Sequence, residues 1–120
     1  MQDYRKLVVW QKAHRLVLDV YADSARHLRH PDAWPVRDQL RPAAISIPSN
    51  IAEGAGRGTD PDFRRFLLHS LGSSNELEYD LLLARDLGFL PVPLHLERTR
   101  QIAEIRCMLS GLIEKLSPRR

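Results

Sequence analysis

The fold is decided by the stretch Ser46-Ile47-Pro48-Ser49-Asn50-Ile51-Ala52-Glu53-Gly54, which sets a proline among residues that otherwise keep helical spacing. The apolar residues around it recur at intervals of three and four: Leu40, Ala44, Ile47 and Ile51. Apolar side chains at this spacing form the buried stripe of an amphipathic helix. We therefore predict a helix over residues 35–55, with the glycines from Gly54 to Gly58 ending it.

Two prolines interrupt this predicted helix. Pro42 cannot donate an amide hydrogen bond to the carbonyl of Asp38, and Pro48 cannot donate one to that of Ala44. An interior proline typically costs about 3 kcal/mol relative to alanine. The helix is therefore predicted to be kinked or broken near Pro48 rather than straight.

A second segment, residues 7–30, has the same helical spacing and ends before Pro31, which disfavours helical geometry at the residue that precedes it. The spacing predicts that this helix buries Val20 and Ala25. Charged residues such as Asp23 are expected to face water.

The third predicted helix has clear start and stop signals. Thr59 or Asp60 can accept hydrogen bonds from its first amides, and Gly88 can close it in the left-handed conformation. A fourth helix begins near Pro93. Four amphipathic helices with short connections predict an all-α fold, an up-and-down antiparallel four-helix bundle that forms a single domain over residues 1–120.

The chain carries 18 basic and 15 acidic residues, a net charge of +3, which favours anionic partners. Residues 1–60 carry nine basic and seven acidic groups, and residues 61–120 carry nine and eight. Because the basic excess is not concentrated in a tail, a basic surface must arise from folding or from assembly of several subunits.

The single cysteine, Cys107, cannot form an internal disulfide, which fits a reducing cytoplasm. The chain begins without a basic region followed by an apolar run, and no apolar stretch approaches the roughly 20 residues that span a bilayer. We expect a cytoplasmic protein with no membrane partner.

Enzymatic and metal-binding signals are weak. The run Gly54-Ala55-Gly56-Arg57-Gly58 has neither a preceding strand nor the lysine and hydroxyl residue of a phosphate-binding loop, so it is interpreted as a turn. No Glu-x-x-His pair suggests a di-iron bundle. Cys107 is expected to fill the core rather than act as a nucleophile. We predict no catalytic residue, no metal and no cofactor.

Five arginines form the candidate nucleic-acid-binding set: Arg37, Arg41, Arg57, Arg64 and Arg65. They are expected around the connection between the second and third helices. One interpretation is a patch that contacts phosphates, with steeply salt-dependent binding. The alternative is salt bridging to Asp38, Asp60 and Asp62.

A second set consists of polar residues at helical spacing: Ser46, Asn50 and Glu53 in one helix, and Ser73, Glu76 and Asp80 in the next. The favoured interpretation is a structural network of hydrogen bonds between helices or a solvated face. A ligand or catalytic site is the alternative.

Three groups of residues resemble a known family. They are Leu7-Val8-Val9-Trp10-Gln11-Lys12-Ala13, then Gln39-Leu40-Arg41 with Ala43 through Gly54, and Phe66-Leu67 through Gly72-Ser73 to Glu76-Leu77-Glu78. In order and spacing they resemble the bacterial four-helix bundle proteins encoded in intervening sequences of 23S rRNA genes. The resemblance spans nearly the whole chain. It departs at Pro42, where an arginine or another helix former is expected.

The resemblance implies a four-helix bundle that assembles as a ring, usually a homopentamer, without an established enzymatic activity. Relatives include the accessory variability determinant of diversity-generating retroelements, a basic pentamer that binds nucleic acid and a reverse transcriptase. We therefore expect a non-enzymatic, homo-oligomeric accessory protein that binds RNA, DNA or a ribonucleoprotein. The alternative is a scaffold that binds a reverse transcriptase or another protein without touching nucleic acid.

Overall fold

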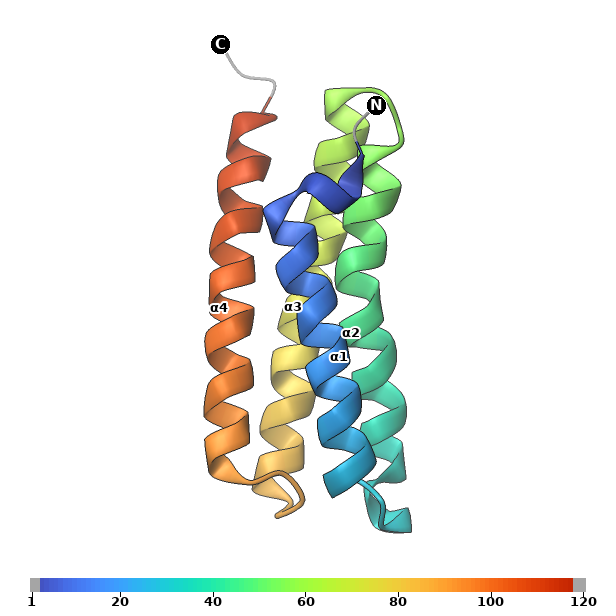
Figure 1. The fold of residues 1–120 in the computed structure, drawn as a ribbon, viewed down its shortest axis with the longest axis vertical. Helices are drawn as coiled ribbons and strands as arrows, with labels where there is room; N and C mark the ends of the chain where they lie inside the picture. Colours follow the sequence, from blue (N-terminus) through green and yellow to red (C-terminus); the bar gives the residue numbers. More distant parts are fainter. Residues whose placement is uncertain (1–2, 118–120) are drawn as a thin grey trace.

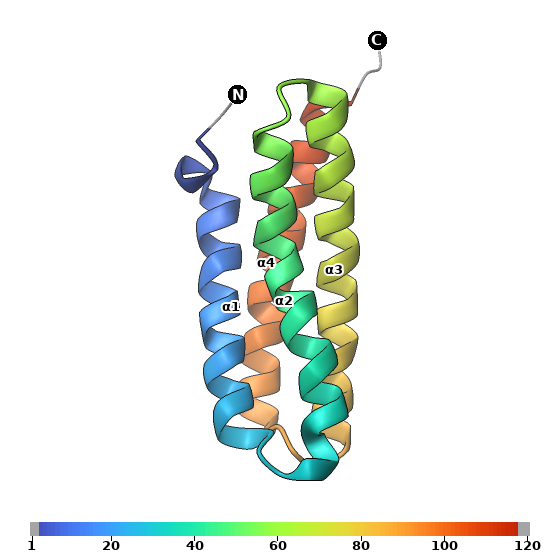
Figure 2. The same ribbon diagram turned by 90° about the vertical axis from the view of Figure 1, so that its right-hand side faces the viewer.

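The computed structural model describes residues 3–117, in which four α-helices lie side by side along one long axis (Figures 1 and 2). They are α1 (Val8–His27), α2 (Trp34–Ala55), α3 (Asp60–Asp86) and α4 (Val92–Lys115), with short 3-10 turns η1 (Tyr4–Lys6) before α1 and η2 (Pro31–Ala33) before α2. Each helix packs against the next, and α1 also packs against α4 to close the bundle. The predicted all-α, up-and-down four-helix bundle is confirmed. Within residues 3–117, no helix is long and apolar enough to cross a membrane.

Helix α2 keeps both of its prolines in its interior without a break. It bends in its middle part instead (Figure 2). The helix is therefore kinked rather than broken, which is one of the two predicted forms. The helix ends at Ala55 as predicted, so Gly54 is still helical, and it begins one residue earlier than predicted, at Trp34. The chain turns toward α3 at Gly58, whose φ of 92° lies in the left-handed region that favours glycine.

Helix α3 begins and ends where its signals predict. The hydroxyl of Thr59 accepts a hydrogen bond from the amide of Asp62 at 3.4 Å. At the other end Gly88 adopts a φ of 87°, and the amides of Phe89 and Leu90 donate to the carbonyl of Ala84. These bonds satisfy carbonyl groups that the last helical turn leaves open.

Helix α1 corrects two predictions. Ala25 is exposed, whereas Asp23 and Ser24 are buried. The buried stripe continues from Val20 by three and four residues, which leads to positions 23 and 24 and leaves position 25 on another face. Asp23 tolerates burial because it pairs with Arg98 of α4.

Helix α4 corrects a third prediction. It buries Ile102, Ile105 and Leu109, whereas Cys107 is exposed. Two positions along a helix amount to a rotation of about 200°, so Cys107 lies on the side opposite Ile105. The residue therefore does not fill the core.

The contact between α2 and α3 is the most extensive in the bundle, and the two helices approach closely at Gly54. A Cβ atom on Gly54 would lie 2.8 Å from the Cβ of Phe66 and 2.9 Å from Cδ1 of Phe63. Real Cβ atoms essentially never come this close to another heavy atom, so the packing leaves no room for a side chain here. Gly54 thus allows close packing of α2 against α3 and does not form a turn.

Candidate nucleic-acid interface

Three of the predicted polar residues meet at the contact between α2 and α3. The side-chain amide of Asn50 donates to Oγ and to the carbonyl oxygen of Ser46, at 2.9 and 2.8 Å. Oγ of Ser46 lies 2.7 Å from Oγ of Ser73, which donates to the carbonyl of His69 at 3.1 Å. Since the hydroxyl proton of Ser73 is engaged there, Ser46 donates to Ser73. The cluster is a directed chain of hydrogen bonds that joins the two helices.

Glu53 and Glu76 lie outside this chain of hydrogen bonds. Glu53 forms a surface ion pair with Arg57, which lies just beyond the end of α2, at 3.8 Å. Glu76 is exposed on α3. The structure therefore brings together three of the six polar residues that the sequence placed at helical spacing.

Asp80, in the turn of α3 that follows Glu76, is a buried carboxylate. Its residue is 6% exposed, and no hydrogen-bond donor within residues 3–117 reaches its Oδ2. Burial, and secondarily the negative charge of Glu76, raises the pKa of the Asp80 carboxyl to about 6. Asp80 belongs to the polar set predicted from the sequence, but like Glu53 and Glu76 it lies outside the chain of hydrogen bonds.

Three of the five candidate arginines lie near the connection between α2 and α3. The guanidinium groups of Arg57 and Arg65 lie 4.9 and 4.6 Å from the centroid of the Phe66 ring. Arg65 also pairs with Asp62 at 3.5 Å. Arg64 points toward α4, where its Nε donates to the carbonyl of Ile113 at 3.3 Å.

The other two arginines lie in the opposite half of α2. Arg41 precedes Ala55, the last residue of α2, by 14 residues, which corresponds to roughly 21 Å along the helix axis. Arg37 lies 5.3 Å from the centroid of the exposed Trp34 ring and pairs with Asp38 at 3.2 Å. The five residues therefore form two groups at different ends of α2 rather than one group at the α2–α3 connection.

Arg41 is held by two residues of α1. Its Nε donates to Oγ of Ser24 at 2.8 Å, and its guanidinium lies 4.7 Å from the centroid of the Tyr21 ring. Among the residues that the structure describes, neither Arg41 nor Arg64 forms an ion pair with a carboxylate, whereas the other three candidate arginines do. The salt-bridge interpretation therefore applies to Arg37 and Arg65 with the predicted partners Asp38 and Asp62, whereas Arg57 pairs with Glu53, which was not among the predicted partners.

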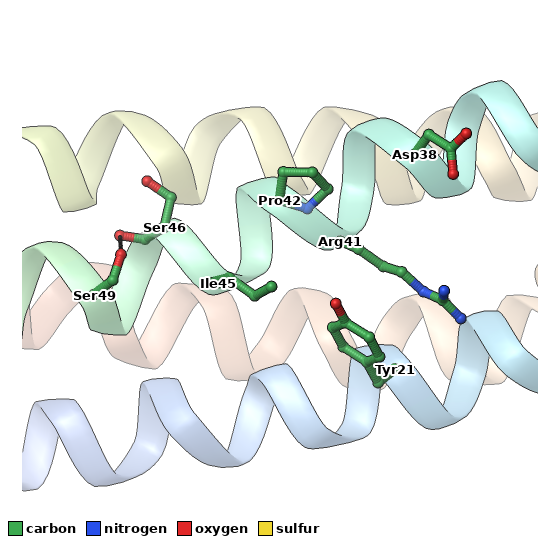
Figure 3. Close-up of a pocket in the computed structure, with 7 residues that line it drawn as sticks. All are labelled: Tyr21, Asp38, Arg41, Pro42, Ile45, Ser46 and Ser49. Atoms are coloured by element: carbon green, nitrogen blue, oxygen red, sulfur yellow. Dashed lines mark hydrogen bonds between the residues drawn. The ribbon is translucent and has the colours of Figure 1, made fainter.

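Arg41 lines a groove between α1 and α2, with a cavity of about 560 Å³ (Figure 3). The lining residues are Tyr21, Asp38, Arg41, Pro42, Ile45, Ser46 and Ser49. A neighbouring cavity of about 320 Å³ shares Ile45 and Ser49 with it and continues toward Trp10 and Tyr4. The two cavities form a mainly apolar groove with one arginine in its wall.

A polar cluster between α1 and α4 was not predicted from the sequence. Nε and Nη2 of Arg98 donate to the two carboxylate oxygens of Asp23 at 2.6 and 3.1 Å. Nη1 donates to Gln101, whose amide donates to Asp19. The side chains of Arg98 and Asp23 are only 12% and 10% exposed. Asp19 and Asp23 are four residues apart, and Arg98 and Gln101 are three apart, so each pair lies on one face of its helix. This spacing was the only feature of the sequence that indicated the cluster.

No group of three or more His, Cys, Asp or Glu residues in the described part of the chain could hold a metal ion. The prominent features are instead arginines stacked on aromatic rings at the surface and polar clusters that tie helices together.

The fold and these surfaces define a small up-and-down helical bundle with several arginines on its outer face. The chain belongs to the family described as 23S rRNA-intervening sequence protein, whose profile matches residues 5–111. This match includes all three groups of residues that carry the resemblance in the sequence. A comparison with curated proteins returns no match.

Proposed function

We propose that this protein is a non-enzymatic, homo-oligomeric accessory protein of the cytoplasm that binds nucleic acid or a ribonucleoprotein through a basic surface. The observation that carries the proposal is the arrangement of its arginines. Four of the five candidates stack on aromatic rings, and Arg41 and Arg64 have no carboxylate partner among residues 3–117. Cations that the protein itself does not neutralise attract phosphate groups.

Assembly would strengthen this attraction. One chain carries a net charge of only +3. A ring of five copies, which the family resemblance suggests, would carry about +15 and would repeat the same arginines around one axis. Simultaneous contacts from several subunits raise the apparent affinity without any new contact within a subunit.

The proposal is tested by fluorescence anisotropy with labelled structured RNA and single-stranded DNA at micromolar protein. We expect binding at about 50 mM salt that weakens steeply by about 200 mM. The absence of salt-sensitive binding to either probe would overturn the nucleic-acid part of the proposal. Light scattering is expected to give a multiple of the 13.8 kDa chain mass, and a monomer at the same concentration would overturn the assembly.

The alternative is a scaffold that binds a reverse transcriptase or another protein directly. It is favoured by the apolar side chains that α3 and α4 expose, including Tyr79 and Leu96, and by a cavity of about 350 Å³ lined in part by Tyr79 and His95. Exposed apolar patches of this kind mark protein interfaces. A pulldown that returns one protein partner, unchanged by nuclease treatment, would select this function over the first.

A further inference from the structure

We propose that the groove at Arg41 and Tyr21 binds one nucleotide unit of a single-stranded nucleic acid, with the phosphate on Arg41 and the base against Tyr21 and Ile45. The inference rests on the proposed nucleic-acid binding and gives it a place and a ligand class. It is carried by three properties of the groove: a pre-positioned cation, a local excess of positive charge and an apolar wall.

The cation is fixed before any ligand arrives. The hydroxyl of Ser24 donates to the carbonyl of Tyr21 at 3.0 Å, and its oxygen accepts the hydrogen bond from Nε of Arg41. Ser24 is fully buried, so this support is anchored in α1. Both terminal nitrogens of Arg41 remain without a hydrogen-bond or ion-pair partner among residues 3–117. A planar guanidinium held in this way can bind two oxygens of one phosphate at a low entropic cost.

The charges around the groove do not cancel Arg41. Asp38 is the acidic residue among the described lining residues, and it pairs with Arg37 at 3.2 Å. The charges of Asp38 and Arg37 neutralise each other. The groove therefore keeps a net positive charge, which is that of Arg41. This favours an anion over a cationic or neutral partner.

The rest of the groove suits a planar apolar group. Figure 3 shows Tyr21 rising from α1 toward α2, with Ile45 on one side of its ring and the guanidinium of Arg41 on the other. Tyr21 and Ile45 are 39% and 43% exposed, and Pro42 of the same wall is also exposed. A cavity of about 560 Å³ falls in the size range of small-ligand sites. Bases stack on aromatic side chains with little regard to their identity, because every base has a π-face.

These features favour a single strand over a duplex. A duplex keeps its bases stacked on one another and would offer Arg41 only a phosphate. A single strand can place a base on Tyr21 while its phosphate binds Arg41. Binding of a duplex would therefore depend on Arg41 but not on the ring of Tyr21.

The test uses the full chain and a fluorescein-labelled ten-residue oligothymidylate, measured by anisotropy at about 50 mM salt. We expect R41A and Y21L to weaken binding by about tenfold or more. Y21F keeps the ring, and R100A removes one positive charge from an exposed ion pair on α4; both are expected to stay within about twofold of the wild type. The salt slope of R41A should fall by about one. If R41A does not fold by circular dichroism, R41K takes its place, and it should also weaken binding because it lacks the planar fork.

The outcomes separate this inference from the proposed function. If the wild type binds and R41A or its replacement behaves like R100A, the site at Arg41 is overturned while nucleic-acid binding stands. If Y21L binds like Y21F, the stacking part is overturned.

If the wild type binds the structured RNA but not the oligothymidylate, the single-strand site is overturned while nucleic-acid binding stands. If it binds neither probe, the nucleic-acid part of the proposed function and the polymer site fall together. An NMR titration with thymidine monophosphate then tests the groove alone. Shifts at Tyr21 and Ile45 would support a site for free nucleotides, and unchanged spectra would overturn the groove as a phosphate site.

Discussion

Gly54 is the residue at which the spacing between α2 and α3 is decided. A methyl group there would meet Phe66 at 2.8 Å and Phe63 at 2.9 Å, and both contacts are with well-packed parts of the bundle. Alanine is a better helix former than glycine, but the helices would have to move apart to admit it. Close packing and helix propensity therefore act in opposite directions at this position.

We predict that G54A lowers the free energy of unfolding by about 1–3 kcal/mol, since the cost of overpacking exceeds the gain in propensity. The measurement is a urea titration at fixed protein concentration. The matched control is G72A in the interior of α3, where an added Cβ meets no atom within 4 Å. That variant should gain about 0.5–1 kcal/mol. Equal shifts in the two variants would contradict a steric role for Gly54.

Asp80 gives the second prediction at the scale of a residue. Its carboxyl has a pKa of about 6 in the folded protein, above the ordinary value of 3.8. The folded state therefore holds the proton more tightly than the unfolded state, and the free energy of unfolding falls as the pH rises from about 4 to 6. Above this window, the charged and buried carboxylate destabilises the fold.

D80N should remove this dependence. At pH 7.5 we expect the variant to be more stable than the wild type by on the order of 1–2 kcal/mol, and at pH 4.5, inside the titration window, the difference should fall to about a third of that. Urea midpoints at the two pH values measure the effect. A difference that is the same at both would show that the titration of Asp80 is not its cause.

At the scale of the helices, the bidentate pair between Asp23 and Arg98 ties the first helix to the last. Both side chains are almost fully covered, with Nε of Arg98 2.6 Å from Oδ2 of Asp23. A buried pair of this kind contributes little compared with a well-packed apolar pair, but it is costly to break from one side. The remaining charge then stays in the bundle without its partner.

We predict that R98M lowers the free energy of unfolding by about 3–5 kcal/mol. The double variant D23L/R98M should recover most of this loss, because it leaves no unpaired charge. R100A, which removes a surface ion pair with Glu97, should cost less than about 1 kcal/mol. Thermal and urea unfolding would both report these differences. A double variant that is no better than R98M would contradict the role of the unpaired Asp23.

The helices themselves could be predicted from the sequence, whereas the side-chain partners could not. Helical spacing and the signals at Thr59 and Gly88 fix where α3 lies, because they depend on neighbours along the chain. The partner of Asp23 lies 75 residues away, on a helix whose rotation about its axis the spacing does not determine. For the same reason the sequence placed five arginines in one group, although Arg41 and Arg57 lie at different ends of α2.

Part of the candidate site was predictable for a local reason. Ser46 and Asn50 are four residues apart on one helix, so their hydrogen bond follows from spacing alone. The contact of Ser46 with Ser73 depends instead on the position of α3 along α2, which spacing within one helix does not determine. The groove at Arg41 had no signal in the sequence, because Tyr21 and Ser24 reach it from another helix.

For the whole molecule, the exposed apolar side chains include residues on two different faces. Ile45 belongs to the groove between α1 and α2, whereas Tyr79 and Leu96 belong to α3 and α4. A closed ring of more than two copies needs two different complementary faces on each subunit. The proposed assembly is compatible with this arrangement, and a face on α4 can be tested without touching Arg41.

We predict that L96D converts the assembly to 13.8 kDa monomers, because a carboxylate on an apolar interface would be buried without a partner. Light scattering measures the mass, and far-UV circular dichroism is the control for the fold. The affinity for the oligothymidylate should fall by about tenfold or more as multivalent contacts are lost. An unchanged mass would remove this face from the assembly.

The first and last elements that the structure describes lie at the same end of the bundle (Figure 1). The turn η1 and the last turn of α4 lie at the end that carries the α2–α3 connection, and the other two connections lie at the opposite end (Figure 1). The order of the helices along the chain can therefore be changed without changing their neighbours. A circular permutant with the old ends joined by a flexible linker and new ends opened at Gly88, an exposed position in a connection, should build the same bundle.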